Sequence, residues 1–384
     1  MVGNAGNTPR TLNVTVAKVG GSLLKPGEVD KVLGKVVERH LADDGKLVIV
    51  VSAMKGVTDT LIRAYDEGEP RLIDEAIQPY LTEAQRLGLG KLGSVIEGIG
   101  ARLKGFISVR EPWARDYVIV HGELLSTMLA EAVLYSSLGV DAGAVYDAGI
   151  VTNEDWGRAS VLGVSSHYVR HRLTWALLRR SVVVVPGFLG MSINGRLTSL
   201  GRGGSDYTAS LIASYLNAPR LIFYTDVEGI MTGDPRIISD ARLVPSLTHE
   251  EAYVASLTGA KKFHPGTFKP LIDSDIQVMV TNPWSSSGTL IMSRCVNTPK
   301  LVSISEAGSI GLVNLKNGYA VTVVGCVMGL DEFRREVYLI ISSYGPIDVV
   351  NDTEGNAVTS IVKDQDVAVK LAKELHRWVV SWIR

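Results

Sequence analysis

The stretch VTVAKVGGS, residues 14–22, decides the fold class of this chain. Its apolar and β-branched residues predict a buried strand, expected over Leu12–Val19, and the glycine pair predicts a tight turn. A strand, a turn and a helix in this order form the repeating unit of a parallel sheet. The helix is expected next, since apolar residues recur at the spacing of one helical face at Val29, Val32, Leu33, Val36, Val37 and Leu41.

The same rhythm continues along most of the chain. Segments of strand length that are rich in valine and isoleucine alternate with helical patterns, which predicts an α/β fold with a mainly parallel sheet covered on both faces. Further strands are expected at Lys46–Ser52, Tyr117–Val120, Val182–Pro186, Leu221–Tyr224 and Ile276–Thr281.

The composition is that of a globular protein. Of 384 residues, 46% are hydrophobic and 21% charged, and 39 basic against 40 acidic residues give a net charge of -1. This balance offers no basic surface for nucleic acid, and the longest apolar runs fall far below the roughly 18 residues that cross a bilayer. Residues 1–13 form a polar tail without the apolar core of a signal peptide. We therefore expect a cytoplasmic protein that binds neither nucleic acid nor membrane.

Residues that commonly bind metals are few and scattered. Cys295 and Cys326 have no metal-site spacing, and we expect both to be small buried hydrophobic residues without a disulfide. His121, His249 and His264 stand apart from one another, so each is expected to be structural. The sequence therefore predicts no protein metal site.

Near residue 297 the pattern changes to a small α+β unit. Its βαββα order is typical of a ferredoxin-like half that lacks its last strand. The expected domains are a tail over 1–13, a catalytic domain over 14–296 and a regulatory domain over 297–384. In the last of these, strands are expected at Ile310–Leu315, Tyr319–Val324, Ile347–Asn351 and Ala357–Val362, and helices at Leu330–Ser343 and Val367–Trp382.

Three clusters near strand ends could carry chemistry. Lys18–Ser22 joins a lysine to a glycine turn that could close on a phosphate, although such turns are also ordinary loop chemistry. Gly201–Thr208 places three glycines, a guanidinium and a carboxylate at a helix start, which favours an anion site over simple capping by Ser205 or Asp206. Tyr224–Arg236 follows a buried strand, where open α/β sheets bind ligands, but a plain loop fits equally well. The sequence contains no GxxxxGK[ST] loop, and no GxGxxG follows a predicted strand to open a helix.

Taken together, the clusters resemble the aspartate kinases of the amino acid kinase family. The match covers about residues 14–296, and the joint occurrence of the motifs is far more specific than any one of them. The similar segments are Lys18–Ser22 (family pattern KxGG[ST]), Ser52–Thr58 (SAxxGxT), Gly122–Leu124 (GEL), Pro186–Gly190 with Leu200–Thr208 (GFxG, LGRGGSDYT), Thr225–Arg236 (TDVxGIxTxDPR) and Gly259–Pro265 (GAKxxHP).

The resemblance implies a three-layer αβα kinase domain that phosphorylates the side chain of L-aspartate with ATP, plus an ACT-type module. Lys18 would stabilise the moving γ-phosphoryl group, Lys261 would help to bind the phosphates, and Asp206 would orient both lysines. Glu123 would contact the substrate ammonium and Arg202 its α-carboxylate. Ser52, Thr58, Phe188, Gly203 and Ser205 would complete the acceptor pocket, and Gly20, Gly21, Ser22, Thr225, Asp226, Met231 and Arg236 would line the nucleotide site.

Elementary chemistry agrees with these implied roles. The aspartate carboxylate is ionised at neutral pH, so positioning and charge neutralisation can supply the catalysis without a strong base. Magnesium would take its ligands mainly from ATP and water, so no protein ligand for it is named.

The chain departs from the family pattern at three places. Leu23 replaces a hydroxyl residue, which leaves another acceptor such as homoserine as an alternative, and Met231 replaces a tyrosine. Aspartate kinases usually carry two ACT modules, whereas residues 298–384 have room for only one. The sequence therefore does not decide whether lysine or threonine inhibits the protein. An unpaired sheet edge in that module predicts a homodimer. A catalytically idle amino acid sensor is the third possibility.

Overall fold

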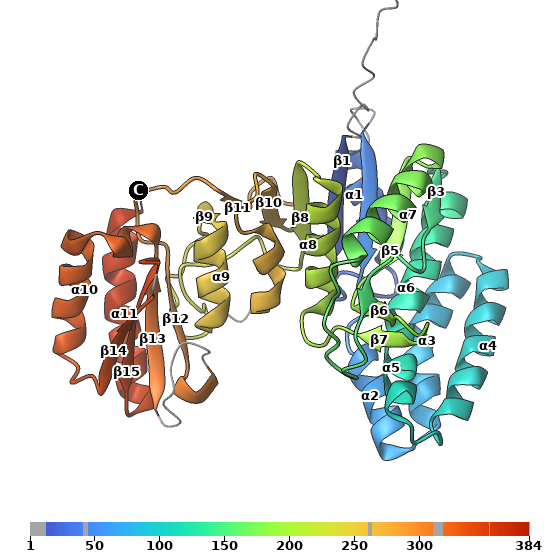
Figure 1. Ribbon diagram of the computed structural model, residues 1–384, viewed down its shortest axis with the longest axis horizontal. Helices are drawn as coiled ribbons and strands as arrows, with labels where there is room; N and C mark the ends of the chain where they lie inside the picture. The colour runs from blue at the N-terminus through green and yellow to red at the C-terminus, as the bar shows by residue number, and fades with distance from the viewer. Residues whose placement is uncertain (1–12, 41–44, 260–262, 310–317, 353, 384) are drawn as a thin grey trace, which may run out of the picture.

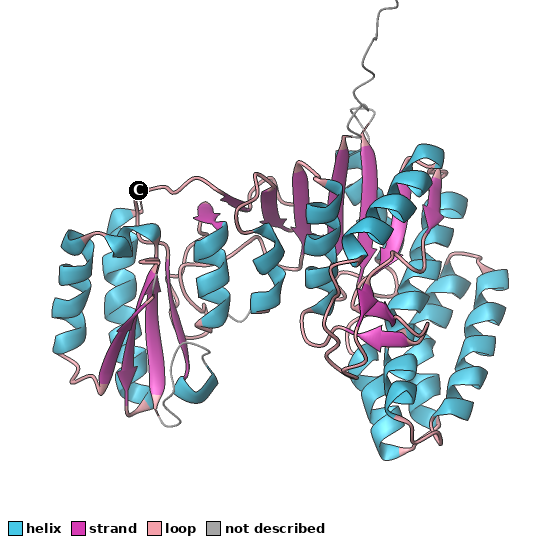
Figure 2. Ribbon diagram, in the orientation of Figure 1, coloured by secondary structure: helices cyan, strands magenta, loops and turns pink. Residues whose placement is uncertain are grey.

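The computed structural model describes residues 13–40, 45–259, 263–309, 318–352 and 354–383. Its large sheet has the strand order β3-β5-β2-β1-β8-β10-β11-β9, and the strands from β3 to β10 pair in parallel. The predicted α/β class with a mainly parallel sheet is confirmed (Figure 2). The strands are β1 (Val14–Val19), β2 (Lys46–Val51), β3 (Ala142–Ala144), β5 (Val182–Pro186), β8 (Arg220–Tyr224), β9 (Ser246–Thr248), β10 (Gln277–Thr281) and β11 (Thr289–Met292).

Alternate residues of the central strands face opposite layers of helices. In β2, Leu47 and Ile49 join the core under α1 to α6, whereas Val48 and Val50 join the core under α7 to α9. Both faces of the sheet are therefore covered, as the continuous apolar runs predict. The helices are α1 (Val29–His40), α2 (Val57–Glu67), α3 (Arg71–Arg86), α4 (Gly90–Phe106), α5 (Pro112–Ile119), α6 (His121–Ala132), α7 (Ser165–Arg179), α8 (Gly204–Leu216) and α9 (His249–Leu257).

The strand predicted at Tyr117–Val120 is wrong. Residues 117–119 belong to α5, and Val120 directly follows this helix. Pro112 takes its first turn, where the missing N–H costs nothing. The helical stretch Pro112–Ser137 is long and apolar enough to cross a membrane, but 72% of its most apolar window is buried, as in a core helix of a globular fold. A short apolar segment of this kind fits a buried helix as well as a buried strand.

The C-terminal unit is a sheet with helices on one face. Its strand order is β12-β13-β15-β14, with α10 and α11 packed on it. Within the described residues no strand follows α11, as expected, but β12 occupies the position beside β13 where such a strand would lie. The predicted strand at residues 310–315 lies outside the described residues. The elements are β12 (Leu301–Glu306), β13 (Tyr319–Val324), α10 (Asp331–Ser342), β14 (Asp348–Asn351), β15 (Ala357–Val362) and α11 (Gln365–Trp382).

The second face of this sheet packs on the large α/β unit. Leu301, Val324 and Ala357 belong to the same apolar core as α7 to α9. In Figure 1, α9 lies between the large sheet and the C-terminal unit. The Ser303 hydroxyl on β12 also donates a hydrogen bond to the Thr258 carbonyl at the end of α9, at 2.9 Å. The unit is therefore docked directly on α9.

The prediction of buried, unpaired cysteines is wrong. Cys295 and Cys326 form a disulfide, and Cys295 is exposed. The antiparallel pairing of β12 with β13 places Leu301 opposite Val324 and so brings the flanking segments together. The pairing could not be predicted from the sequence, because 31 positions separate the two cysteines.

Candidate active site

A cavity of about 570 Å³ lies where β1, β2 and β5 end. We call it the central cavity. It collects residues from segments that are far apart in the sequence, as the sequence motifs predict. The predicted residues that line it are Lys18, Gly21, Ser22, Ser52, Thr58, Glu123, Phe188, Arg202, Gly203, Ser205 and Asp206.

Lys18 and Asp206 form an ion pair inside the central cavity. The Lys18 Nζ lies 2.7 Å from the Asp206 Oδ1, and both side chains are largely buried. Lys18 comes from the end of β1 and Asp206 from the first turn of α8. The pair therefore holds an ammonium group at a strand end, where it can meet an anion.

Two glycines allow the loops around the cavity to touch. A Cβ on Gly21 would lie 2.1 Å from the Ala53 carbonyl oxygen, so only glycine lets these two loops cross. Gly203 has a φ of 70°, and a Cβ there would lie 2.4 Å from the His264 Cβ. Side chains at either position would push the loops apart.

Helix α8 starts at the cavity without a side-chain cap. Gly203 takes the cap position, so the alternative of simple capping by Ser205 or Asp206 is wrong. The first N–H groups of the helix have no side-chain partner from the cap residue, and with the helix dipole they can bind an anion.

Glu123 is a buried carboxyl in the first turn of α6. Its side chain lines the central cavity, and only 3% of the residue is exposed. Burial raises the pKa of Glu123 to about 8, and nearby Lys18 opposes this shift. Within the described residues its Oε2 has no hydrogen-bond partner. A cationic group of a ligand would satisfy this oxygen.

Two buried residues that hold the cavity together were missed by the sequence analysis. The Tyr80 hydroxyl accepts from the Met54 N–H at 3.0 Å and donates to the Gly122 carbonyl at 2.8 Å, which ties the β2 loop to the start of α6. The Asp116 Oδ2 accepts from the Ser199 N–H at 2.7 Å. One feature of the sequence could have indicated Asp116, because it is a carboxylate within an apolar segment. No feature of the sequence singles out Tyr80.

Leu23 lies in the core and does not line the central cavity. Its 5% exposure removes it from contact with an acceptor bound there. The departure from the family pattern at Leu23 therefore affects the packing of the turn and not the acceptor pocket. In this segment the side chain that borders the cavity is that of Ser22.

The predicted nucleotide residues are divided among several places. Met231 and Arg236 line a second cavity of about 350 Å³ between residues 227–236 and β12, which we call the β12 cavity. Thr225 is buried directly after β8, and its hydroxyl donates to Asp226 at 3.1 Å. The Gly20 N–H donates to the Tyr224 carbonyl at 3.1 Å. Lys261 lies outside the described residues.

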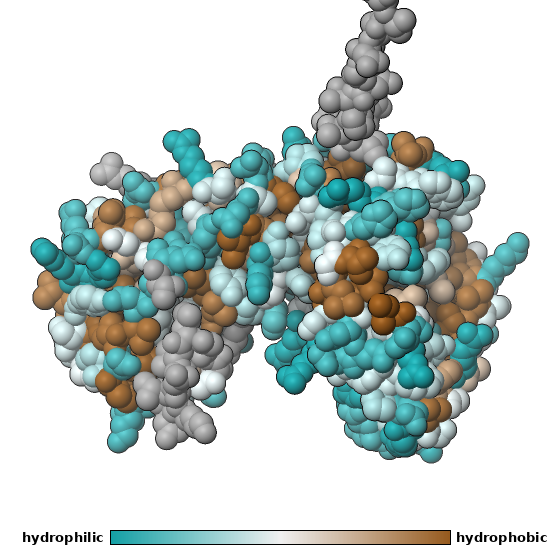
Figure 3. Space-filling view, viewed as in Figure 1, coloured by the Kyte–Doolittle hydropathy of each residue, from teal (hydrophilic) through white to brown (hydrophobic). Residues whose placement is uncertain are grey.

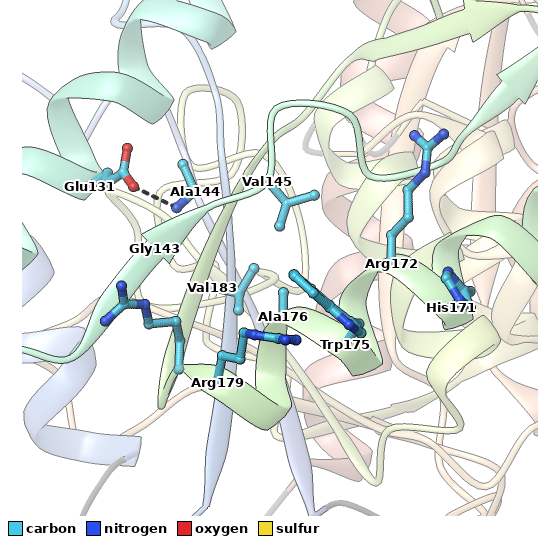
Figure 4. A pocket seen from close by; sticks show the side chains of 11 residues that line it. Glu131, Gly143, Ala144, Val145, His171, Arg172, Trp175, Ala176, Arg179 and Val183 are labelled. Atoms are coloured by element: carbon cyan, nitrogen blue, oxygen red, sulfur yellow. Dashed lines mark hydrogen bonds between the residues drawn. The ribbon is translucent and has the colours of Figure 1, made fainter.

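A third cavity lies away from all of these residues. It measures about 480 Å³ and lies beside the edge strand β3 and helix α7 (Figure 4). The Arg179 guanidinium stacks on the Trp175 ring, and Glu131 accepts from the Ala144 N–H. No residue of the predicted site lines it, so it lies outside the candidate site.

The residues of the site suit a metal ion carried by phosphates. In the part of the chain that the structure describes, no group of three acidic, histidine or cysteine side chains could hold a metal ion. Magnesium binds through one or two carboxylates, phosphate oxygens and water. Asp206 is one of the carboxylates that line the central cavity, and it is already paired with Lys18.

A family model described as the amino acid kinase family matches residues 13–282. The chain belongs to the amino acid kinase family. Lysine-sensitive aspartokinase 3 of Escherichia coli is 29% identical to this amino acid kinase, and the alignment covers 90% of this chain and 80% of the relative. Aspartokinase 2, chloroplastic, of Arabidopsis thaliana is 31% identical over 88% of this chain and 64% of its own length.

Solved structures of relatives show the same fold. Escherichia coli aspartokinase III in complex with aspartate and ADP superposes on this amino acid kinase with a TM-score of 0.79 and 22% identity, covering 95% of this chain and 99% of that chain. The match extends through the C-terminal unit, because it includes nearly the whole chain.

Proposed function

We propose that this protein is an aspartate kinase, which transfers the γ-phosphoryl group of ATP to the side-chain carboxylate of L-aspartate. The aspartokinase relatives support this activity. The observation that carries it is the Lys18–Asp206 ion pair in one cavity with the Glu123 Oε2, which has no hydrogen-bond partner among the residues that the structure describes. The product is 4-phospho-L-aspartate, the first intermediate of lysine, threonine and methionine synthesis, and we propose a cytoplasmic location for this role.

The acceptor is held by its amino acid end. Glu123 binds the ammonium group and exposed Arg202 binds the α-carboxylate, which leaves the side-chain carboxylate directed toward Lys18. The walls of the acceptor pocket are Ser52, Thr58, Phe188, Gly203 and Ser205.

Phosphoryl transfer needs charge stabilisation rather than a base. A carboxylate oxygen of aspartate forms the new bond to the γ-phosphorus while the bond to the β-phosphate oxygen breaks, and ADP leaves. Lys18 and the first N–H groups of α8 stabilise the charge on the moving group, and Asp206 holds the Lys18 ammonium in place. When bound, magnesium neutralises charge on the phosphates.

The nucleotide occupies the side of the site nearer the C-terminal unit. The base enters the β12 cavity beside Met231 and Arg236, and Lys261 binds the phosphates. Apolar walls from Val227, Ile230 and Leu301 suit a flat aromatic base. The phosphates then extend toward the turn at Gly20, Gly21 and Ser22 and toward Thr225 and Asp226.

Two further properties are proposed for the C-terminal unit, which we take as an ACT-type module. It binds an amino acid effector, which the name of the lysine-sensitive relative supports. It also forms a homodimer interface, supported by exposed Leu330, Leu339 and Ile347, and Figure 3 shows hydrophobic surface over this unit. Sedimentation showing a monomer at micromolar concentration would contradict the dimer.

The activity is tested by trapping the acyl phosphate as a hydroxamate with L-aspartate and ATP. ADP release is measured in parallel with L-aspartate, L-homoserine and L-glutamate, each with and without lysine or threonine. Hydroxamate from aspartate is expected. ADP release with homoserine alone would show a different acceptor, and no turnover with any acceptor would support the idle sensor.

A further inference from the structure

Thr232 is the point where the C-terminal unit meets the segment 227–236 that lines the β12 cavity. Thr232 is fully buried. Its carbonyl accepts from the Val302 N–H of β12 at 2.8 Å, and its own N–H donates to the Arg242 carbonyl at 2.8 Å. Its Oγ1 accepts from the Arg242 N–H at 2.9 Å. The backbone of the cavity wall is thus bonded to the unit at this residue.

The fourth hydrogen bond of Thr232 is made with the last helix, α11. The His376 Nε2 lies 2.8 Å from the Thr232 Oγ1, across 144 residues of sequence. His376 is itself fully buried, and burial lowers its pKa, so the ring is neutral near pH 7. Its Nδ1 faces Asp240 at 3.7 Å. A buried neutral histidine joined to a buried threonine fixes the rotamer of both side chains.

The β12 cavity depends on this junction for its shape. One wall is the segment around Ile230, Met231 and Arg236, and the other is Leu301–Ile304 of β12. Thr232 directly follows Met231 and is bonded to Val302 in the opposite wall. A shift of Thr232 would therefore change the distance between the two walls.

We infer that His376 is a positioning residue for nucleotide binding, which holds Thr232 so that the β12 cavity keeps the shape that accepts the base. This inference rests on the proposed function, in which that cavity receives the nucleotide. The central cavity contains neither residue, so aspartate binding is unaffected by His376. The C-terminal unit thereby acts on the affinity for nucleotide and not on the phosphoryl-transfer step.

The test compares three substitutions of His376 in the full chain. His376→Ala removes the hydrogen bond and is expected to raise the KM for ATP by about five- to tenfold. His376→Gln places an amide near the former Nε2 and is expected to restore most of the affinity. His376→Asn is equally polar but ends near the former Nδ1, so it should behave like alanine. Lys373→Ala, on the exposed face of α11, is the matched control.

Two readouts separate positioning from a merely structural role. The KM for aspartate and the kcat at saturating ATP are expected to change less than twofold in all variants. Thr232→Val should raise the KM for ATP at least as much as His376→Ala, because it also removes the bond from the Arg242 N–H. The double variant should differ little from Thr232→Val, since the bond between the two side chains is lost in both. Equal changes in both KM values, or no rescue by glutamine, would overturn the inference.

Calorimetric titration with ADP keeps this test independent of the acceptor. If the wild-type protein forms no aspartyl hydroxamate, the proposed function fails, but the ADP Kd of each variant still reports on His376. An unchanged ADP Kd in His376→Ala, with cooperative unfolding retained, would overturn the inference alone.

Discussion

The two cavities of the site differ in what builds them. The central cavity is formed entirely by the kinase fold, from the ends of β1, β2 and β5 and the starts of α2, α6 and α8. The β12 cavity has one wall from the kinase fold and one from the C-terminal unit. The shape of the proposed acceptor site is therefore fixed by the core of the kinase fold. The shape of the proposed nucleotide site depends in addition on how the C-terminal unit docks.

Removal of the Lys18 ammonium should give the largest effect. Lys18→Ala is expected to lower kcat by about a thousandfold or more, because a charge aimed at the transferring group is lost. The ADP Kd should change less than threefold, as measured by calorimetry. Lys55→Ala, which removes an exposed lysine at the same cavity, is the control. A comparable loss of kcat in Lys55→Ala would show that Lys18 has no specific role in phosphoryl transfer.

Glu123→Gln should weaken acceptor binding without touching the nucleotide side. We expect the KM for aspartate to rise by about 30- to 100-fold, because a buried charge-assisted contact with the ammonium is lost. Steady-state kinetics with each substrate varied in turn would show this. Glu131→Gln, on the same helix but outside the cavity, serves as the control. A matching rise in the KM for ATP would break the separation of the two cavities.

The aspartate side should also carry a pH dependence. Because burial raises the pKa of Glu123 to about 8, the free enzyme holds this carboxyl protonated below pH 8 and must release the proton to bind an ammonium group. The KM for aspartate should therefore fall by up to tenfold per unit as pH rises from 6 to 8, and then level off. The dependence should disappear in Glu123→Gln. If the KM for aspartate still depended on pH in Glu123→Gln, another titrating group would be responsible.

Met231→Tyr should give the smallest effect and sharpen the nucleotide side. Added aromatic surface in the β12 cavity is expected to lower the ADP Kd by about threefold through stacking on the base. The KM for aspartate should stay constant. Weaker ADP binding would mean that the cavity is already filled to its limit by its present walls.

Much of the fold and of the central cavity could be predicted from the sequence, because both rest on local patterns. Apolar periodicity marked β2, β5 and α1, and glycine turns marked the loops at Gly21 and Gly203. The strand prediction for Tyr117–Val120 was wrong because a short apolar run fits a buried helix equally well.

The long-range partnerships could not be predicted. Tyr80, Asp116 and His376 act through contacts with residues 26 to 144 positions away, and a single sequence does not show which buried polar groups will meet. The place of β12 in the sheet was hidden for the same reason, since a strand is assigned to an edge only by its partner.

The disulfide between Cys295 and Cys326 closes the chain into a covalent ring that contains β12. Closure of a loop of about 30 residues lowers the entropy of the unfolded chain and by that measure contributes about 3 to 4 kcal/mol of stability. A protease cut inside the ring would leave both pieces attached until a reductant is added. One wall of the β12 cavity is therefore fastened by a bond that survives backbone cleavage.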